Sequence, residues 1–177
     1  MPNHPSPTPT PLPSPHRNTR AIVRRARLEH LASELLRLGD AMRPPVPVEN
    51  LYAHPPHDLW QPDPAVLAHA TETTTPDIYH NRLDLARAVA QQISGSAWPL
   101  RLQLLGPHPL TEGEIEMFAL ALLLPTGLLA GVSEQQRTPQ TIAIIFQTPI
   151  NQAVTRLGEL GYLAPGENDS LTQETTD

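Results

Sequence analysis

One stretch of the sequence decides the fold: Asn81-Arg82-Leu83-Asp84-Leu85-Ala86-Arg87-Ala88-Val89-Ala90-Gln91. Apolar residues recur through it at every third or fourth position, which is the spacing of one face of an α-helix. That face comprises Leu85, Ala86, Val89, Ala90 and Ile93. The spacing predicts a helix over residues 82–94, which Ser94-Gly95-Ser96 would end.

A second stretch follows after a gap: Glu114-Ile115-Glu116-Met117-Phe118-Ala119-Leu120-Ala121-Leu122-Leu123-Leu124-Pro125. Thr111 is predicted to be the N-cap of a helix from about Glu112, because Glu114 stands three residues later, as in a capping box. Pro125 is expected to end this helix or to start the next turn, since proline interrupts the helical hydrogen bonds.

Together these stretches resemble the ImmA/IrrE family of zinc-dependent peptidases. That family has the form N-R-F-T-L-A-H-E-L-G-H, then E-A-N-x-F-A-x-x-L-L-x-P. The resemblance implies an α+β, mainly helical fold, with a small zincin-like peptidase domain whose sheet is short and poor. It also places the two metal-binding histidines at Arg87 and Gln91, the general base at Ala88, and the third ligand at Glu114.

The residues at these positions lack the chemistry of a zinc peptidase. A catalytic zinc needs three protein ligands and one open position for water. A guanidinium such as that of Arg87 only donates hydrogen bonds, so it cannot coordinate a metal ion. Gln91 is a poor ligand and Ala88 cannot accept a proton. We therefore predict no catalytic residues and no cofactor, and Glu114 either pairs with Arg87 in place of the metal or only caps its helix.

A relocated metal site is the alternative. His80 and Asp84 stand four residues apart, so one helix face would offer two ligands, with Glu114 as a third candidate. However, histidines scattered through proline-rich loops are usually exposed to solvent, which favours the absence of such a site. No glycine-rich phosphate loop and no serine in a nucleophile elbow is present.

The segments before these stretches are less regular. Residues 19–39 are predicted to form a helix capped by Gly39. Its arginines are Arg24, Arg25, Arg27 and Arg37. They offer a surface for phosphates or an acidic partner, but Glu29 and Glu34 interrupt this surface, which favours a face that is simply exposed to solvent. Residues 48–52 are predicted to form a short helical turn. Predicted strands cover Ala65–Thr71 and Asp77–His80, and residues 100–105 form a strand or an irregular core segment.

Residues 139–163 resemble the helix-turn-helix that follows the peptidase region in this family. Thr148 is predicted to be the N-cap of its second helix, with Pro149 as the first helical residue and Gly161 as the C-terminal cap. Asn151, Gln152 and Arg156 are candidates for contact with a partner or with DNA. The segment from 134 to 163 has no net charge, which favours a structural helical subdomain over a DNA reader.

Composition limits the remaining possibilities. The chain of 177 residues has no cysteine, which excludes disulfides, thiolate metal sites and cysteine nucleophiles. A net charge of -6 argues against a general nucleic-acid binder. No apolar run approaches the ~20 residues of a membrane span, and the N-terminus lacks a signal-peptide pattern, so we expect a cytoplasmic protein.

The predicted organisation has four parts. Residues 1–18 form a disordered proline-rich leader, 19–133 the ImmA/IrrE-like domain, 134–163 the helix-turn-helix-like subdomain, and 164–177 a disordered acidic tail.

The resemblance also suggests a role, because family members cleave repressors in bacterial stress-response and mobile-element gene control. Without the ligands, we expect a catalytically inactive pseudopeptidase that regulates by binding a helix-turn-helix repressor or a related peptidase. Two alternatives stay open: a divergent active zinc metallo-endopeptidase that cleaves a repressor, and a DNA-binding transcriptional regulator acting through residues 139–163.

Overall fold

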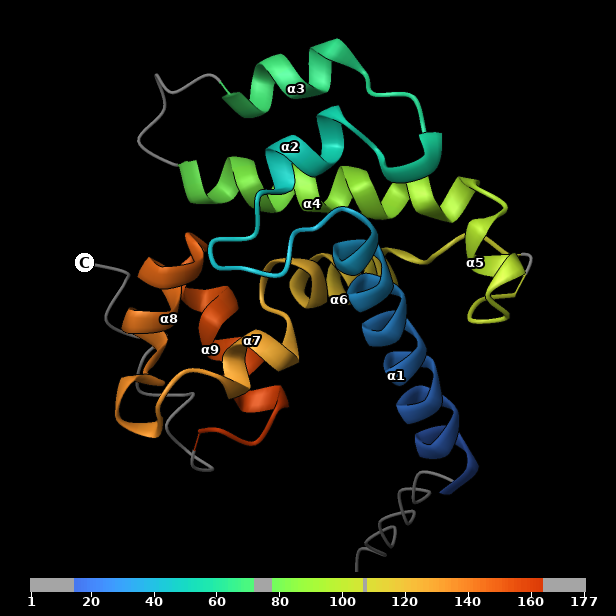
Figure 1. The fold of residues 1–177 in the computed structure, drawn as a ribbon. Helices are drawn as coiled ribbons and strands as arrows, with labels where there is room; N and C mark the ends of the chain where they lie inside the picture. The colour runs from blue at the N-terminus through green and yellow to red at the C-terminus, as the bar shows by residue number, and fades with distance from the viewer. Residues whose placement is uncertain (1–14, 72–77, 107, 164–177) are drawn as a thin grey trace, which may run out of the picture.

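The computed structural model describes residues 15–71, 78–106 and 108–163, and all regular structure in these ranges is helical (Figure 1). The elements in chain order are α1 (Pro15–Leu38), α2 (Val48–Ala53), η1 (Pro56–Asp58), α3 (Pro64–Thr71), α4 (Ile78–Gly95), α5 (Trp98–Arg101), α6 (Glu112–Leu123), α7 (Thr126–Ala130), η2 (Glu134–Gln136), α8 (Pro139–Phe146) and α9 (Ile150–Glu159).

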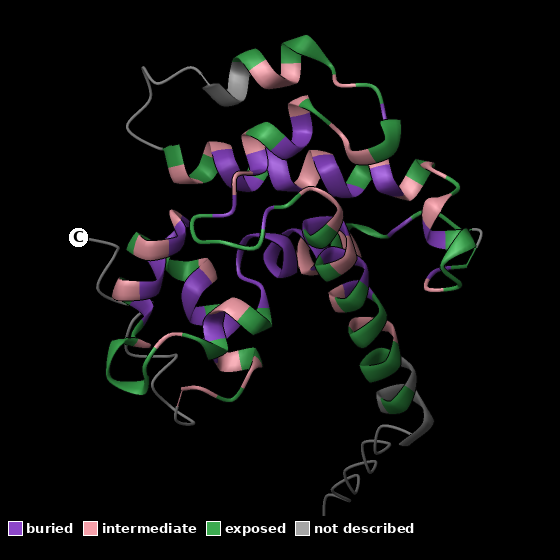
Figure 2. Ribbon diagram, viewed as in Figure 1, coloured by how far each residue is buried: buried purple, intermediate pink, exposed green. Residues whose placement is uncertain are grey.

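Helix α6 is the centre of the molecule. Every residue from Phe118 to Leu123 is buried, so the helix is enclosed on all sides along its second half (Figure 2). It packs against α4 on one side and α1 on the other. A helix that is apolar all round is stable only inside a core, which is why this sequence takes the central position. The capping box predicted at its start is present, since Glu114 N donates to Thr111 Oγ1 and Thr111 N to the Glu114 carboxylate.

Helix α4 covers α6 with the face that the sequence predicts. Leu85, Ala86, Val89, Ala90 and Ile93 are all buried, and α2 and α3 pack against α4 as well. The helix starts at Ile78, four residues before the predicted start, and ends at Gly95.

The predicted strands are wrong wherever the described residues test them. Ala65–Thr71 lies within helix α3, whose start is stabilised by the Asp63 carboxylate accepting a hydrogen bond from Ala65 N at 2.8 Å. Asp63-Pro64 is a helix-start signal, and it overrides the β-propensity of Val66. Residues 78–80 form the first turn of α4, and Asp77 lies outside the described residues. Residues 100–105 run from the end of α5 into irregular turns that end at the buried Leu105, which agrees with the second form predicted for them, an irregular segment, rather than with a strand. The fold is therefore mainly helical as predicted, but the described part of the chain contains no sheet.

The predicted cap of α1 needs a correction. Asp40, not Gly39, adopts the left-handed conformation after this helix, with φ of 49°. Gly39 instead permits a close approach, because a Cβ atom there would lie 2.6 Å from Leu51 Cδ1. A larger residue here would force the end of the Leu51 side chain to move, so glycine allows α1 and α2 to pack closely at this point. None of the helices in the described ranges combines the length and the apolar character needed to cross a bilayer.

The C-terminal hairpin, formed by α8 and α9, has the predicted helices with one shifted boundary. The N-cap of α9 is Pro149 rather than Thr148, because Gln147 turns left-handed with φ of 52° and Thr148 is fully buried. Gly161, predicted as the C-terminal cap, directly follows the C-cap residue Leu160 and has a φ of 72°.

The predicted boundary at 133–134 does not divide the hydrophobic core. One cluster of buried residues includes α6 together with Ile142 of α8 and Leu157 of α9. Helix α1 already begins at Pro15, inside the predicted leader of residues 1–18. Residues 1–14 and the predicted tail of residues 164–177 lie outside the described residues.

Candidate functional site

Arg87 lies at the junction of α4 and α6 and is held by two carboxylates. Its Nε and Nη2 atoms donate to the two Glu116 oxygens at 2.7 and 3.1 Å, and its Nη1 donates to Asp84 Oδ1 at 2.7 Å. The hydrogen bond that Arg87 donates to Glu116 is the main cause of a raised Arg87 pKa, with a smaller contribution from Asp84. The cation is therefore held firmly at this position, although its side chain is 35% exposed.

Glu114 does not make the predicted pair with Arg87. Its carboxylate accepts hydrogen bonds from Thr111 and forms an ion pair with Arg24 of α1, which is the main cause of its lowered pKa. The reason is geometric: residues 114 and 116 are about 200° apart around α6. Because α6 packs between α1 and α4, Glu114 reaches α1 and Glu116 reaches α4. An ion pair does join α4 to α6, but Glu116 makes it, which was not predicted. Glu114 caps its helix, as the alternative held, and in addition pairs with Arg24.

The positions that the resemblance assigns to the zinc site do not fit a zinc ion. Arg87 has no free lone pair, the half-buried Ala88 packs against the hydrophobic core, and Gln91 is exposed. The weak relocated candidates do not converge either, since Asp84 is paired with Arg87 and Glu114 with Arg24. Within the described ranges, no group of three or more His, Asp or Glu side chains is placed to hold a metal ion.

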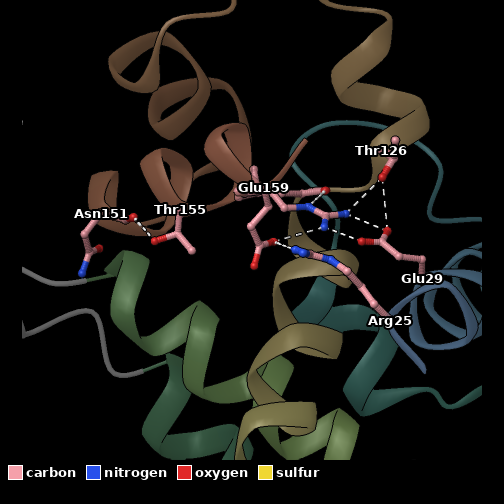
Figure 3. Close-up of polar contacts among 8 residues, drawn as sticks. Arg25, Glu29, Thr126, Asn151, Thr155 and Glu159 are labelled. Carbon is pink, nitrogen blue, oxygen red and sulfur yellow. Dashed lines mark hydrogen bonds and ion pairs between the residues drawn. The ribbon is translucent and has the colours of Figure 1, made fainter. Parts of the chain in front are cut away.

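Arg156 of α9 is the centre of a buried polar network (Figure 3). The side chain is 1% exposed, and its two Nη atoms grip the Glu29 carboxylate of α1, with Nη2 at 2.7 Å from Oε2. Nη2 also donates to Thr126 Oγ1 and Nε donates to Leu124 O, both at 3.1 Å. Thr126 Oγ1 donates in turn to Glu29 Oε2 at 3.2 Å. This network fastens α9 to α1, to the end of α6 and to α7.

A second buried arginine holds the other end of the hairpin. Arg82 of α4 is 5% exposed. Its Nη2 donates to Val46 O at 2.6 Å, its Nε donates to Gln147 O at 3.2 Å, and Nη1 pairs with Glu49 of α2. Gln147 is the left-handed residue of the α8–α9 turn. Arg82 therefore joins α4, the α2 region and the turn of the hairpin.

Sequence reasoning missed the roles of both arginines. Arg82 was not singled out, and Arg156 was predicted to contact a partner or DNA. The sequence did indicate that Arg82 is buried, because it stands three and four residues before Leu85 and Ala86, on the apolar face of its helix. Arg156 likewise stands three residues after Ala153 and four before Leu160. A cation at such a position is buried only if it meets carboxylates and carbonyls, and these come here from distant segments.

The outer surface of the hairpin presents few groups that read DNA. Asn151 and Thr155 lie on the side of α9 away from the Arg156 network (Figure 3), and Gln152 is half-buried. Arg137 packs over the Tyr162 ring at 4.2 Å and donates to Val132 O at 2.6 Å. Both arginines of residues 134–163 are therefore engaged within the protein, whereas a recognition helix needs free cations for the phosphates.

A groove of about 440 Å³ lies where the start of α4 meets the α8–α9 turn. We call it the α4–α9 groove. It brings together two residues predicted from the sequence, His80 and Asn151, and is also lined by Tyr79, Thr148 and Ile150. The described residues that line it include no Asp, Glu, Lys or Arg, and Ile150 is 39% exposed. The groove is suited to an uncharged, apolar occupant.

Comparison of the chain with family models, with curated proteins and with solved structures gave no match.

Proposed function

We propose that this protein is a non-catalytic regulator that binds another protein and does not cut it. The observation that carries the proposal is the Arg87 ion-pair group. At the position where the family resemblance implies a zinc ligand, a guanidinium is bound to Glu116 and Asp84. A group held in this way supplies neither a metal ligand nor a proton acceptor.

The α4–α9 groove supports a protein as the ligand. The centres of protein interfaces are depleted of charged residues, are more apolar than the rest of the surface and are enriched in aromatic residues. The groove matches this description, with Tyr79 and Ile150 in its lining and no carboxylate or guanidinium among the described lining residues. We propose that a helix-turn-helix repressor, the substrate class of the resembling family, inserts an apolar side chain here.

Binding is tested with a purified helix-turn-helix repressor from the organism that encodes this protein. We expect the two purified proteins to co-elute on size-exclusion chromatography, with the repressor still intact after prolonged incubation. Ile150→Asp should abolish the complex by placing a charge in the groove. Ile22→Asp is the matched control, because Ile22 is 68% exposed on α1, outside the groove. Metal-dependent cleavage of the repressor, or equal binding by both variants, would overturn the proposal.

The frame of the resemblance has its own test. The triple variant Arg87→His, Ala88→Glu and Gln91→His restores the peptidase motif on α4. Because Arg87 already reaches Glu116, this glutamate is placed to serve as the third ligand. We expect the triple variant to gain about one chelator-removable zinc per chain, as a three-ligand site does. Adding Glu116→Gln should abolish the gain and Glu114→Gln should leave it intact, which would move the third ligand of the frame from Glu114 to Glu116. A triple variant that folds without gaining zinc would show that the frame is wrong at Arg87, Ala88 and Gln91 as well.

A further inference from the structure

A second pocket shares no lining residue with the α4–α9 groove and lies between η1 and the α4–α5 connection. Its volume is about 410 Å³ and it is lined in part by His57, Asp58, Trp98 and Arg101. We call it the Trp98 pocket. Pockets that bind small molecules have volumes of roughly 300–1,000 Å³. Its size is therefore sufficient for a compact organic ligand.

Four groups in this pocket, three of them on exposed residues, have no partner among the residues that the structure describes. The His57 imidazole, the Asp58 carboxylate, the Trp98 indole and the Arg101 guanidinium form no side-chain hydrogen bond or ion pair with described residues. Other arginines of the described chain, including Arg24, Arg82 and Arg156, are bound to carboxylates. A pocket that gathers both charges and an indole without pairing them offers all of these groups to a ligand.

The backbone adds an independent observation. His57 and Asp58 are consecutive and both left-handed, with φ of 52° and 51°. Residues with a Cβ atom adopt this conformation in only a few per cent of cases, at binding sites as well as at helix ends such as Asp40. Two such residues in a row contribute an imidazole and a carboxylate to the pocket.

We propose that the Trp98 pocket binds a small zwitterion with an apolar body, that is, a free amino acid with an aromatic side chain. The Arg101 guanidinium receives the ligand carboxylate, since this pairing is charge-assisted and can be bidentate. The Asp58 carboxylate accepts from the ligand ammonium group. The Trp98 ring packs against the apolar body. This ligand class satisfies both charged groups and the indole together, whereas a simple anion leaves Asp58 unpaired.

Titration calorimetry with three probes tests the assignment. Phenylalanine carries both charges, 3-phenylpropionate lacks the ammonium group, and phenethylamine lacks the carboxylate. We expect phenylalanine to bind the full chain more tightly than either analogue. Arg101→Gln should weaken phenylalanine and phenylpropionate by about tenfold or more and leave phenethylamine unchanged, since a charge-assisted hydrogen bond is lost. Asp58→Asn should weaken phenylalanine and phenethylamine and leave phenylpropionate unchanged.

Controls separate this site from the rest of the surface. Arg43→Gln removes another exposed arginine, outside the pocket, and should not affect any probe. Phenylalanine should also alter the fluorescence of the half-buried Trp98, a signal that Trp98→Phe removes while the buried Trp60 remains. The proposal is overturned if phenylalanine does not bind, if phenylpropionate binds as tightly as phenylalanine, or if Arg43→Gln matches Arg101→Gln. Because no repressor is involved, these outcomes do not depend on the proposed function.

Discussion

Removing the guanidinium of Arg156 is the most direct perturbation of the C-terminal hairpin. Methionine at this position keeps an unbranched apolar stem and loses the hydrogen-bonding head. Arg156→Met leaves the Glu29 carboxylate without its strongest partner and the Leu124 carbonyl without its donor. Both groups lie beside the core, so the variant should lose stability because these polar groups are left unpaired, not because the side chain is smaller.

The expected cost follows from the burial of the two partners. Removing one partner of a buried ion pair destabilises a protein by about 3–5 kcal/mol. Glu29 retains 24% exposure, so water recovers part of the loss and we expect a value near the lower end, about 3 kcal/mol. Domains are stable by only about 5–15 kcal/mol, so this is a large fraction. For a chain of this size it lowers the melting temperature by roughly 6–12 °C.

Urea denaturation followed by circular dichroism measures the loss directly. The midpoint should fall while the slope with denaturant stays constant, since the surface exposed on unfolding is unchanged. Arg25→Gln is the matched control, because its pair with Glu159 is more exposed and should contribute less than about 1 kcal/mol. Combining Arg156→Met with Glu29→Gln should cost less than the sum of the single changes, with a coupling of about 1–3 kcal/mol.

Two results would refute this reasoning. A loss below about 1 kcal/mol for Arg156→Met would place it among ordinary surface changes. A double-mutant cycle in which the losses of unfolding free energy from Arg156→Met and Glu29→Gln are additive would show that Arg156 and Glu29 do not stabilise each other.

Three further predictions concern the surroundings of α6. Because Arg24 lowers the pKa of Glu114, this carboxylate stabilises the fold above pH 4.5, and its contribution is lost as the pH falls through the lowered pKa. The free energy of unfolding of the unmodified protein should therefore decline as the pH is lowered stepwise below 4.5. The Glu114→Gln variant should show a smaller decline. Thr111→Ala removes the N-cap of α6 and should cost about 1 kcal/mol by urea denaturation, while Thr111→Ser should be nearly neutral. Arg87→Ala breaks a half-exposed pair with Glu116 and should cost no more than about 1 kcal/mol, so a loss above 3 kcal/mol would show that we have misjudged its exposure.

Elements with strong local signals could be predicted from the sequence. The helix around Leu85 and Val89 and the capping box of Thr111 and Glu114 are specified by spacing and by residue type within a few positions. The segment 65–71 could not be assigned from propensity alone, because Asp63 and Pro64 start a helix through contacts that precede it.

The partners of the charged residues depended on tertiary structure. Glu114 and Glu116 are both within reach of a neighbouring helix, and only the packing of α6 between α1 and α4 decides which glutamate meets Arg87. Arg156 looked like a surface residue because its carboxylate partner, Glu29, lies 127 positions earlier in the chain. Composition and periodicity contain no information on such a distant pair.

The two buried arginines together have a consequence for the α4–α9 groove. Two separated attachments restrict the orientation of a helical hairpin more than a single attachment does. Buried residues of α8 and α9 pack in the common core, and the two arginines add polar attachments to it: Arg82 at the turn of the hairpin and Arg156 further along α9. The direction of the hairpin, and with it the shape of the groove, thus depends in part on two side chains absent from its lining.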